Sequence, residues 1–169
     1  MNKKAFQTIK YGMYVISSKK GGKLNGQIAN TVFQVTADPC AIAISVNKLN
    51  YTHEFISDSK VFSVSVISRE ATMPFIGHFG FKSGRNIDKF ANIKFKTGVT
   101  GAPVVTEYAV SFFEAEVIAS FDSGTHTLFL GKVVEADILQ DAIAMSYSYY
   151  HKVKGGLTQK NAPTYVKPE

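Results

Sequence analysis

Residues 25–56 read NGQIANTVFQVTADPCAIAISVNKLNYTHEFI and carry the pattern of a strand hairpin followed by a helix. Asp38-Pro39 separates two runs rich in β-branched residues, 27–36 and 41–47, as the turn of an antiparallel hairpin would. In the second run, bulky Ile and Val alternate with Ala, Ser and Asn. Because successive side chains of a strand point to opposite faces, we expect one bulky face and one small face that becomes polar toward its end.

The small face of the second strand predicts a place where a flat ligand lies close to the backbone, unless a partner subunit covers it. Hydroxyl and amide side chains then lead into an expected helix at 52–59, capped by Asn50 or Thr52. They are Ser45, Asn47, Asn50 and Thr52. Since a helix N-terminus attracts anions, the stretch predicts a ligand with a ring at one end and a phosphate at the other.

The rest of the chain is dominated by strand patterns. Alternation predicts further strands at 11–18, 61–67, 110–120 and 126–138, and a helical period predicts a second helix at 71–79. A loop with two glycines follows at 80–89. Strands without βαβ alternation favour a mainly β fold, an antiparallel barrel with a few peripheral short helices. We expect one domain, 1–169, in which about 141–169 forms an extension that packs on the barrel or on a partner subunit.

The composition narrows the classes of function. With 169 residues, of which 45% are hydrophobic, the chain can bury a core without disulfides or metal. The net charge of +6 comes from scattered lysines, with Arg69 and Arg85 as the only arginines, which argues against nucleic acid as a partner. No run resembles a membrane span or a signal-peptide core, so a cytoplasmic location without membrane association is expected.

The sequence holds no metal or nucleotide motif. Cys40 is the only cysteine, which excludes an internal disulfide and a cysteine zinc cluster, and we expect it to pack as a small hydrophobic residue. His53, His78 and His151 lack the spacing of metal ligands, so no metal is assigned. Neither G-x-G-x-x-G nor a Walker A sequence occurs.

Five segments together resemble the flavin reductase-like family, whose fold is the FMN-binding split barrel. They are the stretch at 25–56, VFSVSVIS at 61–68, FGFKSGRNIDKF at 79–90, SGTHTLFLGKVVEA at 123–136 and KGGLTQKNAPTY at 154–165. Their order and spacing carry the likeness, which spans most of the chain. The tail is most similar to that of flavoredoxins and of the flavin domain of high-molecular-weight rubredoxins.

The resemblance implies FMN bound at a homodimer interface. The residues along the flavin ring would be Asn30, Thr31, Val32 and Phe33. Those from the ribityl chain to the phosphate would be Ser45, Val46, Asn47, Asn50 and Thr52. The phosphate loop would contribute Ser83, Gly84, Arg85 and Lys89, and His126 would lie near the ring and the nicotinamide.

Several of these residues also fit ordinary structural roles. Residues 83–85 could form a surface turn, and His126 could simply open a strand. Tyrosines of the tail could cover the flavin or pack in a dimer contact; they are Tyr147, Tyr149, Tyr150 and Tyr165. The family's G-D-H-T pattern is altered here, because Thr125 replaces the aspartate.

The implied function is an FMN-dependent oxidoreductase that takes electrons from NADH or NADPH. The acceptor would be small or a protein such as a rubredoxin. The rubredoxin-containing relatives carry four further cysteines that this sequence lacks, so either the acceptor is a separate protein or the sequence is part of something longer. No catalytic acid or nucleophile is assigned, since a flavin carries the redox chemistry itself. Two alternatives stay open: a split-barrel oxidase or reductase acting on another substrate, such as a pyridoxine phosphate-type compound, and a non-enzymatic flavin or haem binding module or redox sensor.

Overall fold

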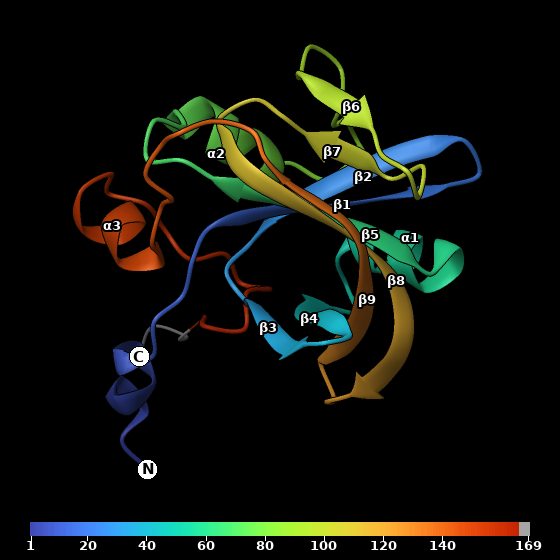
Figure 1. Cartoon of the computed structure of the whole chain (residues 1–169). Coiled ribbons are helices and arrows are strands. Elements are labelled where there is room, and N and C mark those ends of the chain that lie inside the picture. Colours follow the sequence, from blue (N-terminus) through green and yellow to red (C-terminus); the bar gives the residue numbers. More distant parts are fainter. Residues whose placement is uncertain (166–169) are drawn as a thin grey trace.

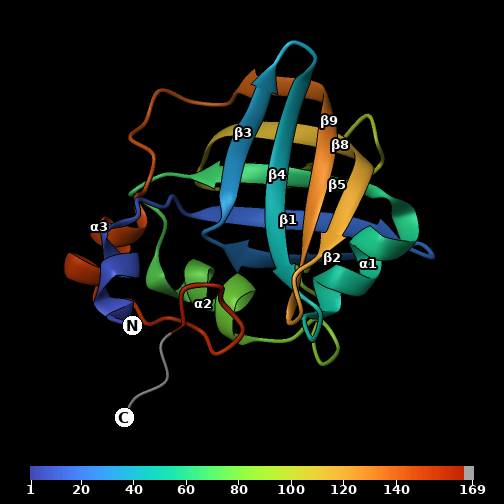
Figure 2. The ribbon, with the colours of Figure 1, turned by 90° about the horizontal axis from the view of Figure 1, so that it is seen from below.

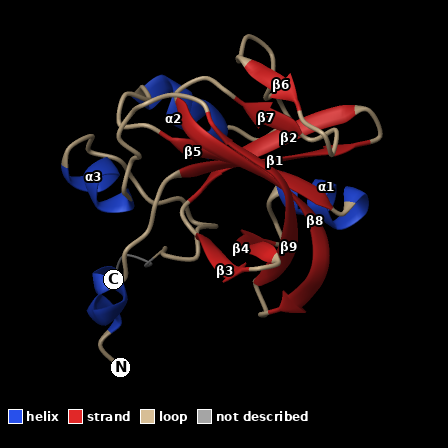
Figure 3. Cartoon of the chain, viewed as in Figure 1, coloured by secondary structure: helices blue, strands red, loops and turns tan. Residues whose placement is uncertain are grey.

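The structure is a computed structural model that describes residues 1–165, and its main feature is a seven-stranded antiparallel sheet (Figures 1 and 3). The strand order is β2-β1-β5-β8-β9-β4-β3. The bounds of these strands are β1 Tyr14–Lys20, β2 Lys23–Ala29, β3 Val32–Ala37, β4 Cys40–Asn47, β5 Val61–Ile67, β8 Ala109–Asp122 and β9 His126–Ile138. A separate hairpin of β6 (Phe95–Thr97) and β7 (Pro103–Val105) lies beside them.

The long strands β8 and β9 join two half-sheets that cross each other. β8 pairs with β5 near its start, and β9 pairs with β4 near its start, while β8 and β9 pair along most of their length. Register shifts interrupt that pairing between Glu114 and Ala115 and between Val117 and Ala119. Such irregularities bend a strand. In Figure 2, β3 and β4 run across the direction of β1, β2 and β5, so the bent hairpin folds the sheet into a barrel.

Two apolar clusters hold this arrangement together. One fills the barrel with side chains from β1, β4, β5 and β9, and includes Ile44, Phe62 and Phe129. The bulky face predicted for 41–47 is confirmed, since Ile42, Ile44 and Val46 all belong to this cluster. The second cluster lies between the sheet, α2 and the C-terminal region.

In the described part of the chain, three helices lie outside the barrel: α1 (Tyr51–Ser59), α2 (Met73–Phe81) and α3 (Tyr147–Lys152). A short helix near the N-terminus, η1 (Lys3–Thr8), lies away from the sheet (Figure 1). The Thr72 hydroxyl caps α2 by accepting from the Phe75 amide, and α2 buries Phe75, Ile76 and Phe79. Tyr150 of α3 is buried in the second cluster, so α3 packs against the barrel of the same chain. No helix of residues 1–165 has the length and hydropathy to cross a membrane.

Three sequence expectations need correction. The run 27–36 is not one strand, because the chain turns at Asn30–Thr31 and its two parts pair with different strands, β1 and β4. The loop expected from Gly80 begins later, since α2 continues to Phe81. Cys40 is exposed rather than packed, because it lies at the end of the β3–β4 hairpin and its thiol donates to the Ala37 carbonyl.

Gly131 of β9 offers a test of the barrel core. A Cβ there would lie 2.7 Å from Ala115 Cβ and 2.7 Å from the fully buried Phe62 ring. We expect Gly131→Ala to lower the free energy of unfolding by about 1–3 kcal/mol, measured by urea denaturation. Gly77→Ala is the matched control, because nothing lies within 4 Å of its Cβ and alanine favours a helix. Wild-type stability in Gly131→Ala would contradict the packing described.

Candidate functional site

Two adjoining clefts lie between β2, the end of β4, α2 and the C-terminal tail. Including the space at their openings to solvent, the clefts have volumes of about 550 Å³ and about 560 Å³. Both are lined by the same six residues in the middle: Gln27, Asn50, Gly80, Phe81, Gln159 and Asn161. Since these residues are shared, the clefts form one continuous groove with two ends.

The first cleft is the apolar end of the groove. Aromatic and aliphatic side chains form much of its wall, including Ile76, Phe81, Tyr147 and Tyr150. Polar side chains at Asn30, Ser45 and Asn47 face it from the strand ends. Flat apolar walls with a few polar groups suit a ring system. Burial raises the pKa of Tyr150, so its hydroxyl stays protonated at neutral pH and donates to the Leu157 carbonyl.

The second cleft is the cationic end. Lys82, Ser83, Gly84 and Lys89 line it from the loop after α2, and Thr52 lines it from α1. Lys89 is 2% exposed, and its ammonium donates to the His78 carbonyl. Burial, with the nearby Lys82 charge, lowers the pKa of Lys89 to about 8. The cleft therefore holds positive charge at neutral pH that an anion would stabilise.

Two buried acceptors in the groove lack hydrogen-bond partners among the described residues. They are Asn25 Oδ1 and Gln27 Oε1. The Asn25 amide nitrogen donates to Thr52 Oγ1 at 2.9 Å, which fixes the orientation of its free oxygen. A buried polar atom without a partner costs free energy, so both oxygens suit a ligand that brings hydroxyl donors.

The N-terminus of α1 also faces the groove without its usual cap. Asn50 is the N-cap residue, but its side chain makes no capping hydrogen bond. Its Oδ1 instead accepts from the Asn161 amide nitrogen at 2.9 Å. Of the two cap candidates expected from the sequence, Asn50 and Thr52, the structure has Asn50 at the N-cap position, but the C-terminal tail engages its side chain.

The C-terminal tail, residues 157–164, crosses the first cleft and contributes part of its wall. Besides the contact with Asn50, the Asn161 carbonyl accepts from His126 Nε2 at 3.2 Å. Thr164 Oγ1 accepts from the Asn30 amide nitrogen at 2.8 Å. Three residues expected from the sequence to contact the flavin therefore hold the tail in place.

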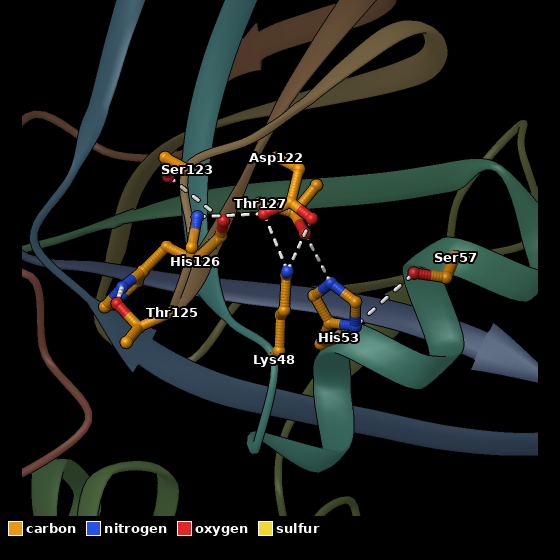
Figure 4. Close-up of polar contacts among 9 residues, drawn as sticks. Lys48, His53, Ser57, Asp122, Ser123, Thr125, His126 and Thr127 are labelled. Atoms are coloured by element: carbon orange, nitrogen blue, oxygen red, sulfur yellow. Dashed lines mark hydrogen bonds and ion pairs between the residues drawn. The ribbon is translucent and has the colours of Figure 1, made fainter.

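His126 is oriented by the turn between β8 and β9 (Figure 4). Because its Nε2 donates to a carbonyl, neutral His126 carries its proton there, and its Nδ1 accepts from the Thr125 hydroxyl at 2.9 Å. Asp122 anchors the turn through an ion pair with Lys48 at 2.6 Å, which lowers the pKa of Asp122. The Asn161 carbonyl thus sets the tautomer of His126, and Thr125, which replaces an aspartate of the family pattern, donates to its other ring nitrogen.

His53 of α1 contacts the start of β9, next to the same turn. Its Nε2 lies 2.8 Å from the Thr127 hydroxyl (Figure 4), and its ring packs against Phe129. Burial, followed by the nearby Lys48 charge, lowers the pKa of His53, so it is neutral at pH 7. Among the described residues, no group of three or more His, Cys, Asp or Glu side chains is arranged to hold a metal ion.

The structure brings together many of the site residues expected from the sequence. Those that line the groove are Asn30, Ser45, Asn47, Asn50, Thr52, Ser83, Gly84 and Lys89. Those that do not line it are Thr31, Val32, Phe33, Val46, Arg85 and His126. The reasons differ: Val46 faces the barrel core, Phe33 is exposed on the edge strand, and Arg85 pairs with Glu54.

Other groove residues were not expected from the sequence. They are chiefly Asn25, Gln27, Phe81, Lys82, Gln159 and Asn161. Asn25 and Gln27 lie two apart on β2 and so share a face, a polar alternation that could have marked them. No local signal marks Gln159 or Asn161, because only the folded tail brings them to the groove.

A family model described as "Flavin reductase like domain" matches residues 6–158. The chain belongs to this family. It is 48% identical over 166 residues to a high molecular weight rubredoxin from Moorella thermoacetica, covering 98% of this chain and 72% of that protein. It is 46% identical over 167 residues to a ferric-chelate reductase (NAD(P)H) from Archaeoglobus fulgidus, covering 99% of both.

A solved structure confirms the expected fold. It is an NADH:FAD oxidoreductase from Streptomyces globisporus C-1027, with a TM-score of 0.76 at 26% identity, covering 84% of this chain and 83% of that one. The resemblance inferred from the five sequence segments is confirmed by the family model, and the mainly β, antiparallel prediction is confirmed by the sheet.

Proposed function

We propose that this flavin reductase-like protein is an oxidoreductase that binds FMN, takes electrons from NADH or NADPH, and passes them to a protein or small acceptor. The observation that carries the proposal is the groove, which is apolar and aromatic at one end and cationic at the other. FMN has the same polarity, with a ring system joined through a polyol to a phosphate. The family and the reductase names of its relatives support this reading.

The residues of the groove fit FMN along its length. Asn30, Ser45 and Asn47 would contact the ring in the first cleft, together with the aromatic wall. The middle of the groove would receive the ribityl chain, whose hydroxyls can donate to the unpaired oxygens of Asn25 and Gln27. Thr52, Ser83, Gly84 and Lys89 would hold the phosphate beside the N-terminus of α1.

The residues of the chain would bind the flavin, orient it and shield it from water. Bound FMN would supply the hydride and single-electron chemistry. The residues that line the groove include no Asp, Glu or His, so a phosphate there meets no like charge. His126 fixes the tail across the first cleft by donating to the Asn161 carbonyl, and the tail limits the access of water to the ring end.

The proposal extends to partners. A redox protein acceptor is supported by the relative that carries the name rubredoxin. A homodimer is supported by large apolar side chains left exposed on three strands: Phe33 and Val35 on β3, Ile118 and Phe121 on β8, and Val134 and Ile138 on β9. Soluble monomers rarely leave large contiguous apolar patches exposed. A cytoplasmic location stays a prediction from the sequence.

The proposed function predicts a yellow protein. Reconstitution with FMN should give bound-flavin absorbance that is bleached on anaerobic addition of NADH or NADPH. Stopped-flow absorbance would measure the rate, and air or a ferric chelate should restore the colour. A protein that does not bind FMN would refute the proposal, whereas tight binding without nicotinamide oxidation would favour the non-enzymatic binding module.

Lys89 gives a prediction at the phosphate end. Lys89→Met should weaken FMN binding by about 10- to 100-fold, because a charge-assisted hydrogen bond contributes about 1.5–3 kcal/mol. Riboflavin, which lacks the phosphate, should bind the variant and the wild type alike. Fluorescence titration of the apoprotein measures both affinities, and Lys94→Met, at an exposed lysine away from the groove, is the control.

The affinity for FMN should also depend on pH through Lys89. Its pKa of about 8 means that the cation is present at pH 7 and is lost as pH rises. The protonated form binds the phosphate better, so the dissociation constant should increase above pH 8 in the wild type. The same titration of Lys89→Met should be flat over this range; an identical increase in both proteins would exclude Lys89 as the phosphate contact.

The dimer is tested at β3. Phe33 is 49% exposed, so Phe33→Lys should leave the fold intact. If β3 lies in the dimer contact, the added charge should raise the dimer dissociation constant by about tenfold or more. Analytical ultracentrifugation measures this, with Val99→Lys on the β6–β7 hairpin as the control. A wild-type protein that sediments as a monomer at micromolar concentration would remove the dimer from the proposal.

A further inference from the structure

Arg85 lies next to the phosphate end of the groove but points away from it. Its guanidinium pairs with Glu54 and stacks on Tyr51, with its Cζ 4.4 Å from the centroid of the Tyr51 ring. Arg85 is not among the residues that line either cleft. The three side chains, which we call the Arg85 clamp, connect the loop after α2 to the first turn of α1.

The clamp connects two adjacent walls of the second cleft. Tyr51 lines the cleft on α1, and Gly84 lines it on the loop. The loop is packed tightly at this point, because a Cβ on Gly84 would lie 1.9 Å from Asn25 Oδ1 and 3.3 Å from Tyr51 Cδ1. At the cationic end of the groove, the loop therefore packs directly against Asn25 and Tyr51 at Gly84, and the Arg85 side chain links it to Glu54 of α1.

The charges at this end match a terminal phosphate. Lys82 and Lys89 both line the cleft, while the charge of Arg85 is balanced by Glu54. A phosphate monoester carries about two negative charges at neutral pH. The phosphate nearest the flavin in a dinucleotide carries one charge and continues into a second phosphate and a nucleoside. Two lysines at the end of the groove thus complement the charge of the monoester better than that of the dinucleotide.

We infer that the Arg85 clamp makes this site selective for a flavin that ends in a phosphate monoester, FMN, over the dinucleotide FAD. We take the adenylate part of FAD to leave between the 83–85 loop and Tyr51, where Gly84 packs against Tyr51 and the clamp holds the loop to α1. Arg85 is thus a specificity-determining residue and not a phosphate ligand. The inference rests on the proposed function, because it places the flavin phosphate in the second cleft.

The size of the effect follows from the exposure of the clamp. The side chains of Arg85 and Glu54 are 49% and 39% exposed. An exposed ion pair and an exposed cation–π contact are each weak, so opening the clamp should change the selectivity by about five- to tenfold and not by orders of magnitude. The discrimination is a difference between two affinities, and the experiment therefore compares FMN with FAD on the same protein.

The test is a flavin-binding titration of the apoprotein that needs no turnover. Dissociation constants for FMN, FAD and riboflavin are measured by quenching of flavin fluorescence for the wild type, Arg85→Ala and Glu54→Gln. Circular dichroism melting confirms that the variants fold. We expect the wild type to prefer FMN over FAD. Both variants should bind FAD about five- to tenfold more tightly than the wild type, with the FMN constant changed less than about twofold.

The other outcomes overturn the inference in distinguishable ways. If Arg85→Ala loses affinity for FMN but not for riboflavin, Arg85 contacts the phosphate directly and the clamp assignment is wrong. If the wild type binds FAD as tightly as FMN, or if both variants keep the wild-type ratio of the FMN and FAD dissociation constants, the clamp does not select the flavin, although the proposed flavin function stands. If the wild type binds none of the three flavins, the proposed function itself fails.

Discussion

The groove depends on the pairing of β8 with β9. These strands are long enough to pair with β5 at one end of the hairpin and with β4 at the other, and their register shifts bend them between the two. Without that bend, the half-sheet of β1, β2 and β5 would lie in one plane with β3 and β4. The bend brings Asn25 and Gln27 of β2 close to Ser45 and Asn47 of β4 across one groove. The binding site is therefore a consequence of how the sheet closes.

Electrostatics distinguishes the two ends of the groove. Burying the Lys89 ammonium is unfavourable, as its lowered pKa shows, and nearby Lys82 makes it more so. The hydrogen bond from the Lys89 ammonium to the His78 carbonyl offsets only part of this unfavourable free energy. A bound phosphate would supply the missing countercharge, so the binding energy of a phosphorylated ligand comes partly from relieving a cost already present in the protein. The Arg85–Glu54 pair adds no net charge to this end of the groove, because its two charges neutralise each other.

The tail shows how residues distant in sequence share one role. Asn50, His126 and Asn30 come from the N-cap of α1, the start of β9 and the end of β2, and each hydrogen-bonds residues 161–164. The sequence predicted Asn30 and His126 near the flavin ring and Asn50 between the ribityl chain and the phosphate, but it predicted no contact of these residues with the tail. Their hydrogen bonds place Gln159 and Asn161 at the centre of the groove, where neither residue could be expected from local pattern.

The amino-acid sequence alone determined the local elements and the chemical character of the site. Alternation predicted the strands at 41–47, 61–67 and 126–138 and the bulky buried face of 41–47, because these signals depend on neighbours a few residues away. The start of α1 was predicted to within two residues, with Asn50 or Thr52 as its cap. Only the tertiary structure decided that 27–36 divides between two half-sheets, that Cys40 is exposed and that Arg85 turns to Glu54. Each of these three features depends on residues far along the chain: on which strands pair with each other, or on where a countercharge lies. These contacts exist only once the sheet has closed.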